Sequence, residues 1–235
     1  AITNCLNFGN PEKPEVMGEF VECIDGMKEA CEFLDFPVVS GNVSFYNETN
    51  SKSIFPTPVI GGIGIFDSLN KIINLKTKKI GNIIIVIGKT FGHLNQSSFI
   101  KEMHSIDDGP PPEINLTNEK NNGYSVLNLI KNNLVSSCHD VSSGGILIAL
   151  AEMSMASRLG LKIIKPKKFA DMNEYFFSED QGRYLLEIEH NNLDKIENIL
   201  KKNNTFYEIV AEVQSDIFEI DKTFSIKTQE LNDLN

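Results

Sequence analysis

The chain has 235 residues, of which 41% are hydrophobic and 23% charged, as expected of a globular protein that can bury an adequate core. Its formal net charge of -10 argues against broad nucleic-acid binding, which needs a basic surface. The four cysteines are widely spaced without a CxxC pair, so we predict reduced thiols in a cytoplasmic protein rather than a zinc site or disulfides. No apolar run approaches membrane-spanning length and nothing resembles a signal peptide, so no membrane association is predicted.

The first third of the chain predicts a strand, a helix and two further strands. Residues 1–9 are typical of a strand that runs into a loop, and Pro14 suits the first turn of a helix. Apolar residues then keep helical spacing at Val16, Phe20, Ile24, Met27, Cys31 and Leu34. After Pro37 we expect a strand that ends at Gly41, and another at 58–66 whose glycines indicate close approach by a neighbour.

A polar stretch rich in Lys and Asn, at 67–79, predicts a domain boundary. Beyond it we expect strands at 80–88, 135–139, 182–189 and 206–213, and helices at 124–133, 143–159 and 193–202. The tail after Asp221 is polar and is expected to fray. This alternation of strands and helices predicts an α/β or α+β fold.

The most informative stretch is Gly41-Asn42-Val43-Ser44, which follows an apolar run. Glycine allows the backbone to approach an anion, and the Asn side-chain oxygen suits a hard cation. Gly-Asn is also ordinary turn chemistry, so the pattern alone favours a simple strand-to-turn junction. Asn4 and Asn7 stand at the end of another predicted strand, and the two stretches together favour a site for a phosphate and a divalent cation.

A second candidate is the run from His139 to Gly145, where a predicted strand ends, glycines follow and a helix begins. This order places free backbone amides and the positive end of the helix dipole at one point. Asp140 could hold a cation there and His139 could meet a phosphate. The alternative is that Ser142 only caps the helix and the glycines only allow tight packing.

A third candidate is the loop around Glu179, Asp180 and Gln181, just before a predicted strand. Two carboxylates beside an amide could bind a cation or a phosphate. Loops of this kind are usually only solvated, and that alternative is favoured here. No P-loop, dinucleotide fingerprint or nucleophile-elbow motif is present in the sequence.

The chain resembles the synthetase subunits of phosphoribosylformylglycinamidine synthase in several stretches, which follow in the same order: residues 1–15, 37–49, 56–61, 139–145 and 178–184. These subunits belong to the wider aminoimidazole ribonucleotide synthetase-like superfamily. The resemblance implies that 1–67 is the later part of a second N-terminal α/β domain, 68–76 a linker, 77–220 a complete C-terminal α/β domain and 221–235 a tail. It therefore implies that the chain is a fragment of a longer protein.

The resemblance also implies an activity. The family uses ATP and Mg²⁺ to phosphorylate the amide oxygen of formylglycinamide ribonucleotide, and glutamine-derived ammonia then displaces phosphate to give the amidine in purine biosynthesis. A glutaminase subunit and a small accessory subunit are the implied partners. Since the family's catalytic histidine is expected outside this chain, we expect the fragment alone to be inactive.

Individual roles follow from the matched motifs. Asn4 and Gly41 are expected to contact ATP, Asn42 to bind magnesium and Ser44 to contact the ribonucleotide. The family's synthetase subunits contain two similar halves in one chain, and the resemblance is to the second. Four positions in this chain are equivalent to residues that the first half uses for magnesium and substrate: Asp140, Glu179, Asp180 and Gln181.

Two alternatives remain open. The chain could be a catalytically inert structural or dimerisation half with a pseudo-site, and a homodimer is one option for it. It could also be a related ATP-dependent superfamily member, such as a selenophosphate synthetase or a thiamine-monophosphate kinase.

Overall fold

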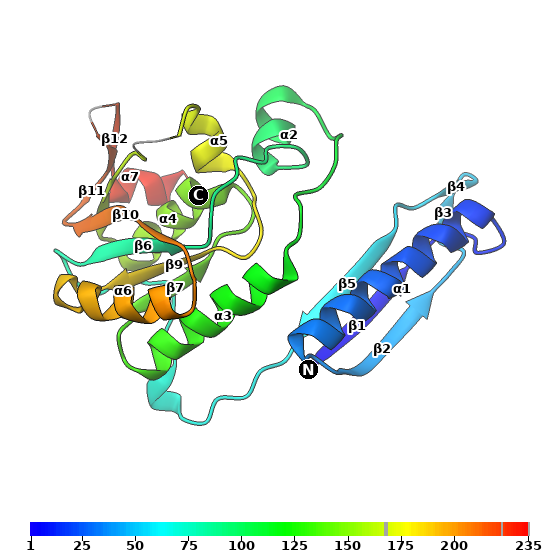
Figure 1. The fold of residues 1–235 in the computed structure, drawn as a ribbon. Coiled ribbons are helices and arrows are strands. Elements are labelled where there is room, and N and C mark those ends of the chain that lie inside the picture. Colours follow the sequence, from blue (N-terminus) through cyan, green and yellow to red (C-terminus); the bar gives the residue numbers. More distant parts are fainter. Residues whose placement is uncertain (167–168, 222, 235) are drawn as a thin grey trace. The chain divides into compact units, whose positions relative to one another are not determined.

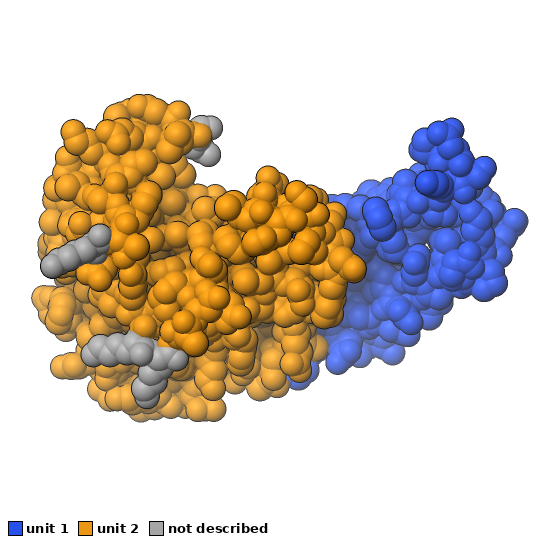
Figure 2. Space-filling view, turned by 90° about the horizontal axis from the view of Figure 1, so that it is seen from above, with its two compact units in different colours: residues 1–67 blue, residues 68–235 orange. Residues whose placement is uncertain are grey.

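The computed structural model describes residues 1–166, 169–221 and 223–234 and divides into two compact units, residues 1–67 and 68–235 (Figure 2). Both units combine strands and helices, so the predicted α/β (α+β) class is confirmed. None of the helices in the described part of the chain is both long and apolar enough to cross a membrane.

Unit 1 is a three-stranded sheet with one long helix (Figure 1). Its strands are β1 (Ile2–Asn7), β2 (Val38–Ser44) and β5 (Thr57–Gly62), in the order β2-β1-β5. β1 pairs in parallel with β2 and antiparallel with β5. Helix α1 (Pro14–Leu34) connects β1 to β2 along the chain. A short hairpin of β3 (Glu48–Thr49) and β4 (Lys52–Ser53) precedes β5.

Helix α1 covers one face of this sheet because its apolar stripe matches β1. Pro14 occupies the first turn as predicted, and the helix ends where Asp35 takes a left-handed φ of 61°. The small core consists of Leu6, Phe8 and Val16, with Phe20, Cys23, Met27 and Phe45 packed against them. The predicted stripe is wrong at one turn: Cys23 packs here, whereas Ile24 is 37% exposed, because the packed residues follow a 4-3-4 spacing.

Unit 2 is a seven-stranded mixed sheet in the order β12-β11-β8-β10-β6-β9-β7. Its strands are β6 (Ile83–Ile87), β7 (Ser137–Asp140), β8 (Gly160–Ile163), β9 (Tyr184–Ile188), β10 (Tyr207–Gln214), β11 (Ile217–Ile220) and β12 (Phe224–Lys227). The helices are α2 (Ser98–His104), α3 (Leu116–Lys131), α4 (Gly145–Ser157), α5 (Met172–Phe177), α6 (Leu193–Lys202) and α7 (Thr228–Asp233). Short 3-10 turns lie at η1 (Leu69–Lys71) and η2 (His190–Asn192).

Strand β6 divides the core of unit 2 into two layers. All five of its residues are buried, and alternate side chains face opposite sides of the sheet. Ile84 and Val86 pack with α4 and α5, whereas Ile83, Ile85 and Ile87 pack with α3 and α6. Figure 1 shows α4 and α7 on one side of the sheet and α3 and α6 on the other. The near-continuous apolar run at 83–87 is therefore explained by burial on both faces.

Both ends of unit 2 are better ordered than the sequence predicts. The expected linker contributes Ile73 and Leu75 to the two core clusters. The tail expected to fray instead pairs as β12 against β11 and continues into α7, which contacts α4. Thr228 is 3% exposed, so the start of α7 is held inside the unit. The prediction was wrong because it rested on the polar composition of the tail, which does not indicate whether a short segment pairs with a neighbouring strand.

A buried carboxylate fastens the start of unit 2 to its centre. Glu187, on β9, has no exposed surface. Its oxygens accept hydrogen bonds from the backbone N–H groups of Lys78 (2.9 and 3.0 Å) and Lys79 (3.1 Å). Asn82 Nδ2 and Ser137 Oγ donate two more, at 2.8 and 3.0 Å. A charge buried at this depth is tolerated because donors surround it.

Candidate functional site

The first predicted site lies on the paired strands β1 and β2 of unit 1. In the parallel register Asn4 stands opposite Gly41, Cys5 opposite Asn42 and Asn7 opposite Ser44. The sequence predicts a strand that ends at Gly41, but β2 continues to Ser44, so these residues belong to the strand and not to a loop after it. The structure therefore brings the two stretches together side by side, in extended backbone.

This extended backbone separates the four predicted residues between two faces of the sheet. Asn4 is on the same face as Leu6, which packs against α1. Asn42 and Ser44 alternate onto the opposite face, where the Thr3 and Ser40 hydroxyls lie 2.7 Å apart. Asn4 and Gly41 thus form one pair, and Asn42 and Ser44 another.

Asn4 and Gly41 are in close contact. A Cβ atom added to Gly41 would lie 2.1 Å from Asn4 Oδ1, so the Asn4 amide extends across the space that a side chain at 41 would fill. Among the described residues, the Asn4 amide has no hydrogen-bond partner within the chain. It leaves both a donor and an acceptor without a partner in the described part of the chain, beside backbone that only glycine leaves accessible.

Asn42 and Ser44 are accompanied by neutral oxygens. On their face the neighbours along β1 and β2 are Cys5, Asn7 and Ser40, and none is a carboxylate. In the described residues no group of three or more His, Cys, Asp and Glu side chains could hold a metal ion. Mg²⁺ keeps several waters and is often shared with substrate phosphates, so one amide oxygen fits as a single ligand to a metal-nucleotide complex but not as a site for the bare ion.

The carboxyl ends of β1 and β2 are closed by a residue that the sequence did not single out. Asn47 Nδ2 donates to the carbonyl oxygens of Phe8 (3.0 Å) and Ser44 (2.9 Å). The backbone N–H of Asn47 also donates to Phe8 O at 3.1 Å. Asn47 thereby joins the two strand ends beyond the predicted site. Its place shortly after a strand was the available signal, but many loop asparagines share it.

In unit 2 the loop between α5 and β9 carries Glu179, Asp180 and Gln181. Glu179 Oε1 accepts from the backbone N–H groups of Ser98 (2.8 Å) and Gly144 (2.7 Å). Gly144, not Ser142, is the cap of α4, and no side chain caps that helix. The carboxylate therefore joins three separate loops and is not merely solvated.

Asp180 is more deeply buried, at 4% exposed. Its Oδ2 accepts from the N–H groups of Phe91 (2.8 Å) and Gly92 (3.1 Å), and its Oδ1 from that of His93 (3.3 Å). The Nη1 atom of Arg183 lies 3.9 Å from Oδ2. Both oxygens are therefore occupied by donors from within the chain.

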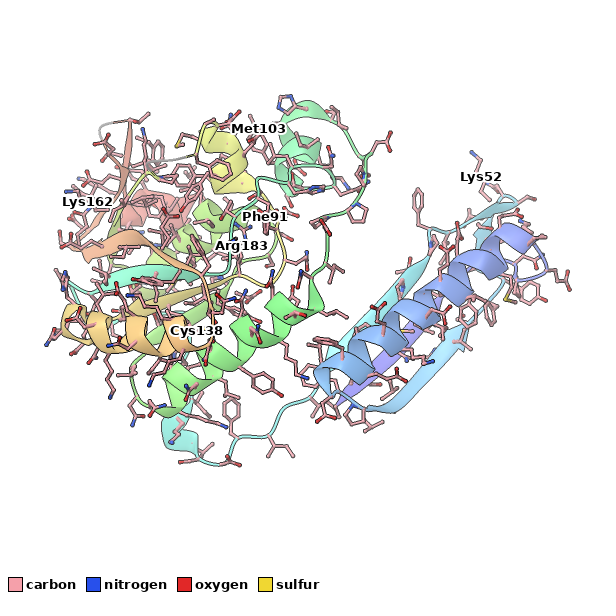
Figure 3. The ribbon with its side chains drawn as sticks, in the orientation of Figure 1. Lys52, Phe91, Met103, Cys138, Lys162 and Arg183 are labelled. Carbon is pink, nitrogen blue, oxygen red and sulfur yellow. The ribbon has the colours of Figure 1, made fainter. Side chains whose placement is uncertain are left out.

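Arg183 has a structural role in this loop. It is 1% exposed and donates to the carbonyl oxygens of Asp180 (3.1 Å) and Ser178 (2.7 Å), and to Thr90 Oγ1 (3.0 Å). Burial lowers the pKa of this guanidinium and the neighbouring Asp180 carboxylate raises it, with burial the larger effect. Figure 3 labels Arg183 and Phe91. No pattern in the sequence distinguishes this buried arginine from a ligand-binding one.

Asp140 lies at the end of β7, beside the imidazole of His139. His139 Nδ1 is 3.3 Å from Asp140 Oδ1, and Nε2 is 2.7 Å from Glu152 Oε2 on α4. The Asp140 side chain is 67% exposed, so it remains open to solvent and to a ligand. The suggested cation-binding role of Asp140 stays a prediction, and the imidazole suggested to meet a phosphate is engaged on both ring nitrogens.

Gln181 lines two of the cavities at this edge of unit 2. One has a volume of about 240 Å³ and includes Ser142, Ser143 and Glu179. The other, about 400 Å³, includes Asn118, Asn122 and Lys201. Of the three predicted loop residues, Gln181 is the one whose side chain makes only a long contact, 3.4 Å, to Glu179 O.

Comparison with known proteins gives the family. The model described as AIR synthase related protein, C-terminal domain, matches residues 79–220, and the corresponding N-terminal domain matches residues 1–66. Phosphoribosylformylglycinamidine synthase subunit PurL of Pelagibacter ubique is 47% identical over 231 residues, which is 98% of this chain and 32% of that protein. The resemblance predicted from the motifs is confirmed, and the chain spans about a third of the length of the curated relatives it matches.

Two solved structures show the same fold. T. maritima PurL complexed with ATP has a TM-score of 0.72 at 17% identity, over 98% of this chain and 37% of that one. T. maritima PurL complexed with FGAR has a TM-score of 0.73 at 19% identity, over 98% and 39%. At these identities the likeness establishes the fold of the chain and does not establish its chemistry.

Proposed function

Since the chain belongs to the family of AIR synthase related proteins, we propose that it is part of an ATP-dependent ligase of purine biosynthesis. The reaction would convert formylglycinamide ribonucleotide and glutamine-derived ammonia into the formylglycinamidine ribonucleotide. The relative in P. ubique and the T. maritima structures with ATP and with FGAR support this proposal. The chain covers 32% of the P. ubique relative, which supports the proposal that the activity would belong to a longer protein and that the chain alone would be inactive.

The observation that carries the proposal is the pairing of Asn4 with Gly41. The amide of Asn4 has no partner among the described residues and lies against backbone without a side chain, which suits contact with ATP. On the opposite face Asn42 would supply one oxygen to magnesium, and Ser44 a hydroxyl to the ribonucleotide. These roles would require a ligand that reaches both faces, around the end of the edge strand β2.

The chemistry that ATP supplies is phosphorylation of the substrate amide oxygen, which turns that oxygen into a leaving group for displacement by ammonia. The residues of this chain would bind and orient, and none is assigned a proton transfer. A histidine outside the chain would serve as the catalytic residue. Glutaminase and small accessory subunits would deliver ammonia, and the assembly would work in the cytoplasm.

A second candidate function is an inert structural half, and one observation favours it for unit 2. The carboxylates of Glu179 and Asp180, expected by resemblance to serve magnesium and substrate, are occupied by backbone donors within the chain. Unit 2 would then act as scaffold while unit 1 contributes to the ATP site.

The test is ATP binding to the full-length protein in the presence of magnesium, measured by calorimetry. Asn42→Ala should weaken binding about tenfold, equivalent to about 1.4 kcal/mol, without changing the unfolding temperature, because its side chain is exposed. Thr49→Ala, an exposed change in the β3–β4 hairpin, is the matched control and should bind normally. If Asn42→Ala and Asn4→Ala both bind ATP as the unmodified protein does, the site is wrongly assigned.

A further inference from the structure

The loop Phe91–His93 has the geometry of an anion-binding nest. Three successive backbone N–H groups converge on one carboxylate, with donor-to-oxygen distances of 2.8, 3.1 and 3.3 Å. Gly92 has a φ of +84°, the left-handed conformation that lets neighbouring amides turn toward one point. A Cβ at Gly92 would lie 3.1 Å from Glu174 Cβ and 3.2 Å from Phe169 Cζ, so both conformation and space call for glycine.

The anion in this nest comes from the chain itself. We propose that Asp180 is a positioning residue, whose carboxylate serves as the resident anion of the Phe91–His93 nest and is not a metal ligand. Each of its oxygens already accepts a backbone hydrogen bond, and Arg183 Nη1 lies 3.9 Å away. A divalent cation bound to this carboxylate would be repelled by the positive charge of Arg183. It would also displace the three backbone N–H groups, for which no other described group supplies an acceptor.

The nest controls the wall of a cavity. A space of about 550 Å³ is lined by Phe91, Gly92, His93, Glu113, Asn115, Asn118 and Asp180. Phe91, 71% exposed, extends from the nest. If the Asp180 carboxylate is removed, three amides lose their acceptor, and we expect residues 91–93 to change conformation and this wall with them.

The neighbouring residue extends the same arrangement. Glu179 joins Ser98 and Gly144, so the two carboxylates hold the segment 91–98 and the turn before α4 to one loop. Gln181 is then the member of the triplet whose side chain remains available in the adjacent cavities. The proposal thus assigns different roles to three consecutive polar residues.

Anion rescue of Asp180→Ala tests the proposal in the full chain. Deletion of the side chain should lower the unfolding temperature by about 5–10 °C in sodium chloride. Sodium acetate at equal ionic strength and pH supplies the missing carboxylate and should recover about a third or more of that loss by preferential binding to the folded state. Asp180→Asn should also unfold earlier, yet gain nothing from acetate, because its amide fills the nest.

Asp107→Ala is the matched control, since the Asp107 side chain is 67% exposed and forms an ion pair with Lys101 at 3.5 Å. It and the unmodified chain should shift by less than about 1 °C between the two salts. A response of Asp180→Ala to acetate no larger than theirs would overturn the proposal. Neither nucleotide nor activity enters the measurement, so its result is independent of the proposed ligase function.

Should Asp180→Ala not fold, hydrogen exchange of the unmodified chain tests the same geometry. The amides of Phe91, Gly92 and His93 should exchange far more slowly than those of the exposed segment 106–109. Equal exchange in the two segments would show that the carboxylate does not hold the nest, and would overturn the proposal.

Discussion

The two units use polar side chains in opposite ways. In unit 1, Asn4 has no hydrogen-bond partner among the described residues, and Asn42 is exposed on a strand. In unit 2, Glu179 and Asp180 are surrounded by backbone donors from other loops. Among the described residues, polar side chains near glycines are therefore left without an internal partner in one unit, whereas in the other they hold separate loops together. The difference lies in whether nearby backbone donors already have an acceptor within the chain.

The strongest way to test this contrast is to remove the most enclosed carboxylate. Glu187→Ala should lower the free energy of unfolding by about 3–5 kcal/mol, because the N–H groups of Lys78 and Lys79 and the Asn82 amide lose a buried acceptor. Urea denaturation of the full chain measures the loss.

Glu189→Ala is the control for that change. Glu189 lies just after β9 and pairs with Lys79 at 3.5 Å, with 42% of its side chain exposed, so its loss should cost less than about 0.5 kcal/mol. A similar small cost for Glu187→Ala would show that enclosure by donors does not distinguish fastening residues in unit 2.

The thiols offer a second contrast, since unit 1 has three cysteines and unit 2 has Cys138. Burial, with a smaller contribution from the Asp140 charge, raises the pKa of Cys138 from 9.0 to about 12. At pH 8 its thiolate fraction is then far below that of an ordinary thiol, and we expect iodoacetamide to modify it about a hundredfold more slowly. Mass spectrometry of the native chain measures the order of modification.

The same shift predicts a pH dependence. The folded state favours the protonated thiol, so this contribution to stability is fully present below pH 9 and is lost as pH rises from 9 toward about 12. Cys138→Ala removes that part of the dependence, and its difference in unfolding temperature from the unmodified chain should change across this window. Modification of Cys138 at the rate of Cys31 in the native chain would contradict the prediction.

The smallest expected change in stability concerns unit 1, where the Asn4 amide has no partner among the described residues. Gly41→Ala places a Cβ 2.1 Å from Asn4 Oδ1, and because that atom ends a flexible side chain, Asn4 should move aside at a cost of less than about 1 kcal/mol. ATP affinity of the full-length protein should nevertheless fall about tenfold, as measured by calorimetry.

The double variant Asn4→Ala/Gly41→Ala separates the two effects. It should regain the stability lost in Gly41→Ala, because the close contact is gone, while ATP affinity stays low. If Gly41→Ala and the double variant both bind ATP with normal affinity, the unpartnered Asn4 amide does not mark a ligand site. It would then distinguish unit 1 from unit 2 no better than the carboxylates do.

Much of the secondary structure of the core could be predicted from the sequence because periodicity and breakers agree there, although the core strand β8 was missed. The Leu193–Lys202 helix was predicted to the residue, and Ile83–Ile87 was recognisable as a buried strand. Phe224–Lys227 and Thr228–Asp233 were missed because they are short and polar and are held by pairing with β11 and contact with α4. Tertiary contacts of this kind leave no local pattern.

The candidate site was predictable only in part, for a different reason. The pairing of Asn4 with Gly41 follows from two strands that both end in polar residues. Gly41 and Asn42 lie on opposite faces because β2 extends to Ser44. A Gly-Asn sequence is typical of a turn, so the sequence did not predict this extension. The fastening roles of Glu179, Asp180 and Glu187 depend on backbone amides that are distant in sequence, and no spacing rule identifies those.

The position of β6 has a consequence for how the protein is made. This strand is the first of unit 2 to be synthesised, yet its neighbours in the sheet, β9 and β10, are completed roughly a hundred residues later. At ordinary translation rates the run Ile83–Ile87 stays without its partners for about 5–20 seconds. During that interval five consecutive β-branched residues are exposed on the nascent chain, which is the kind of segment that chaperones bind and that aggregates when they do not.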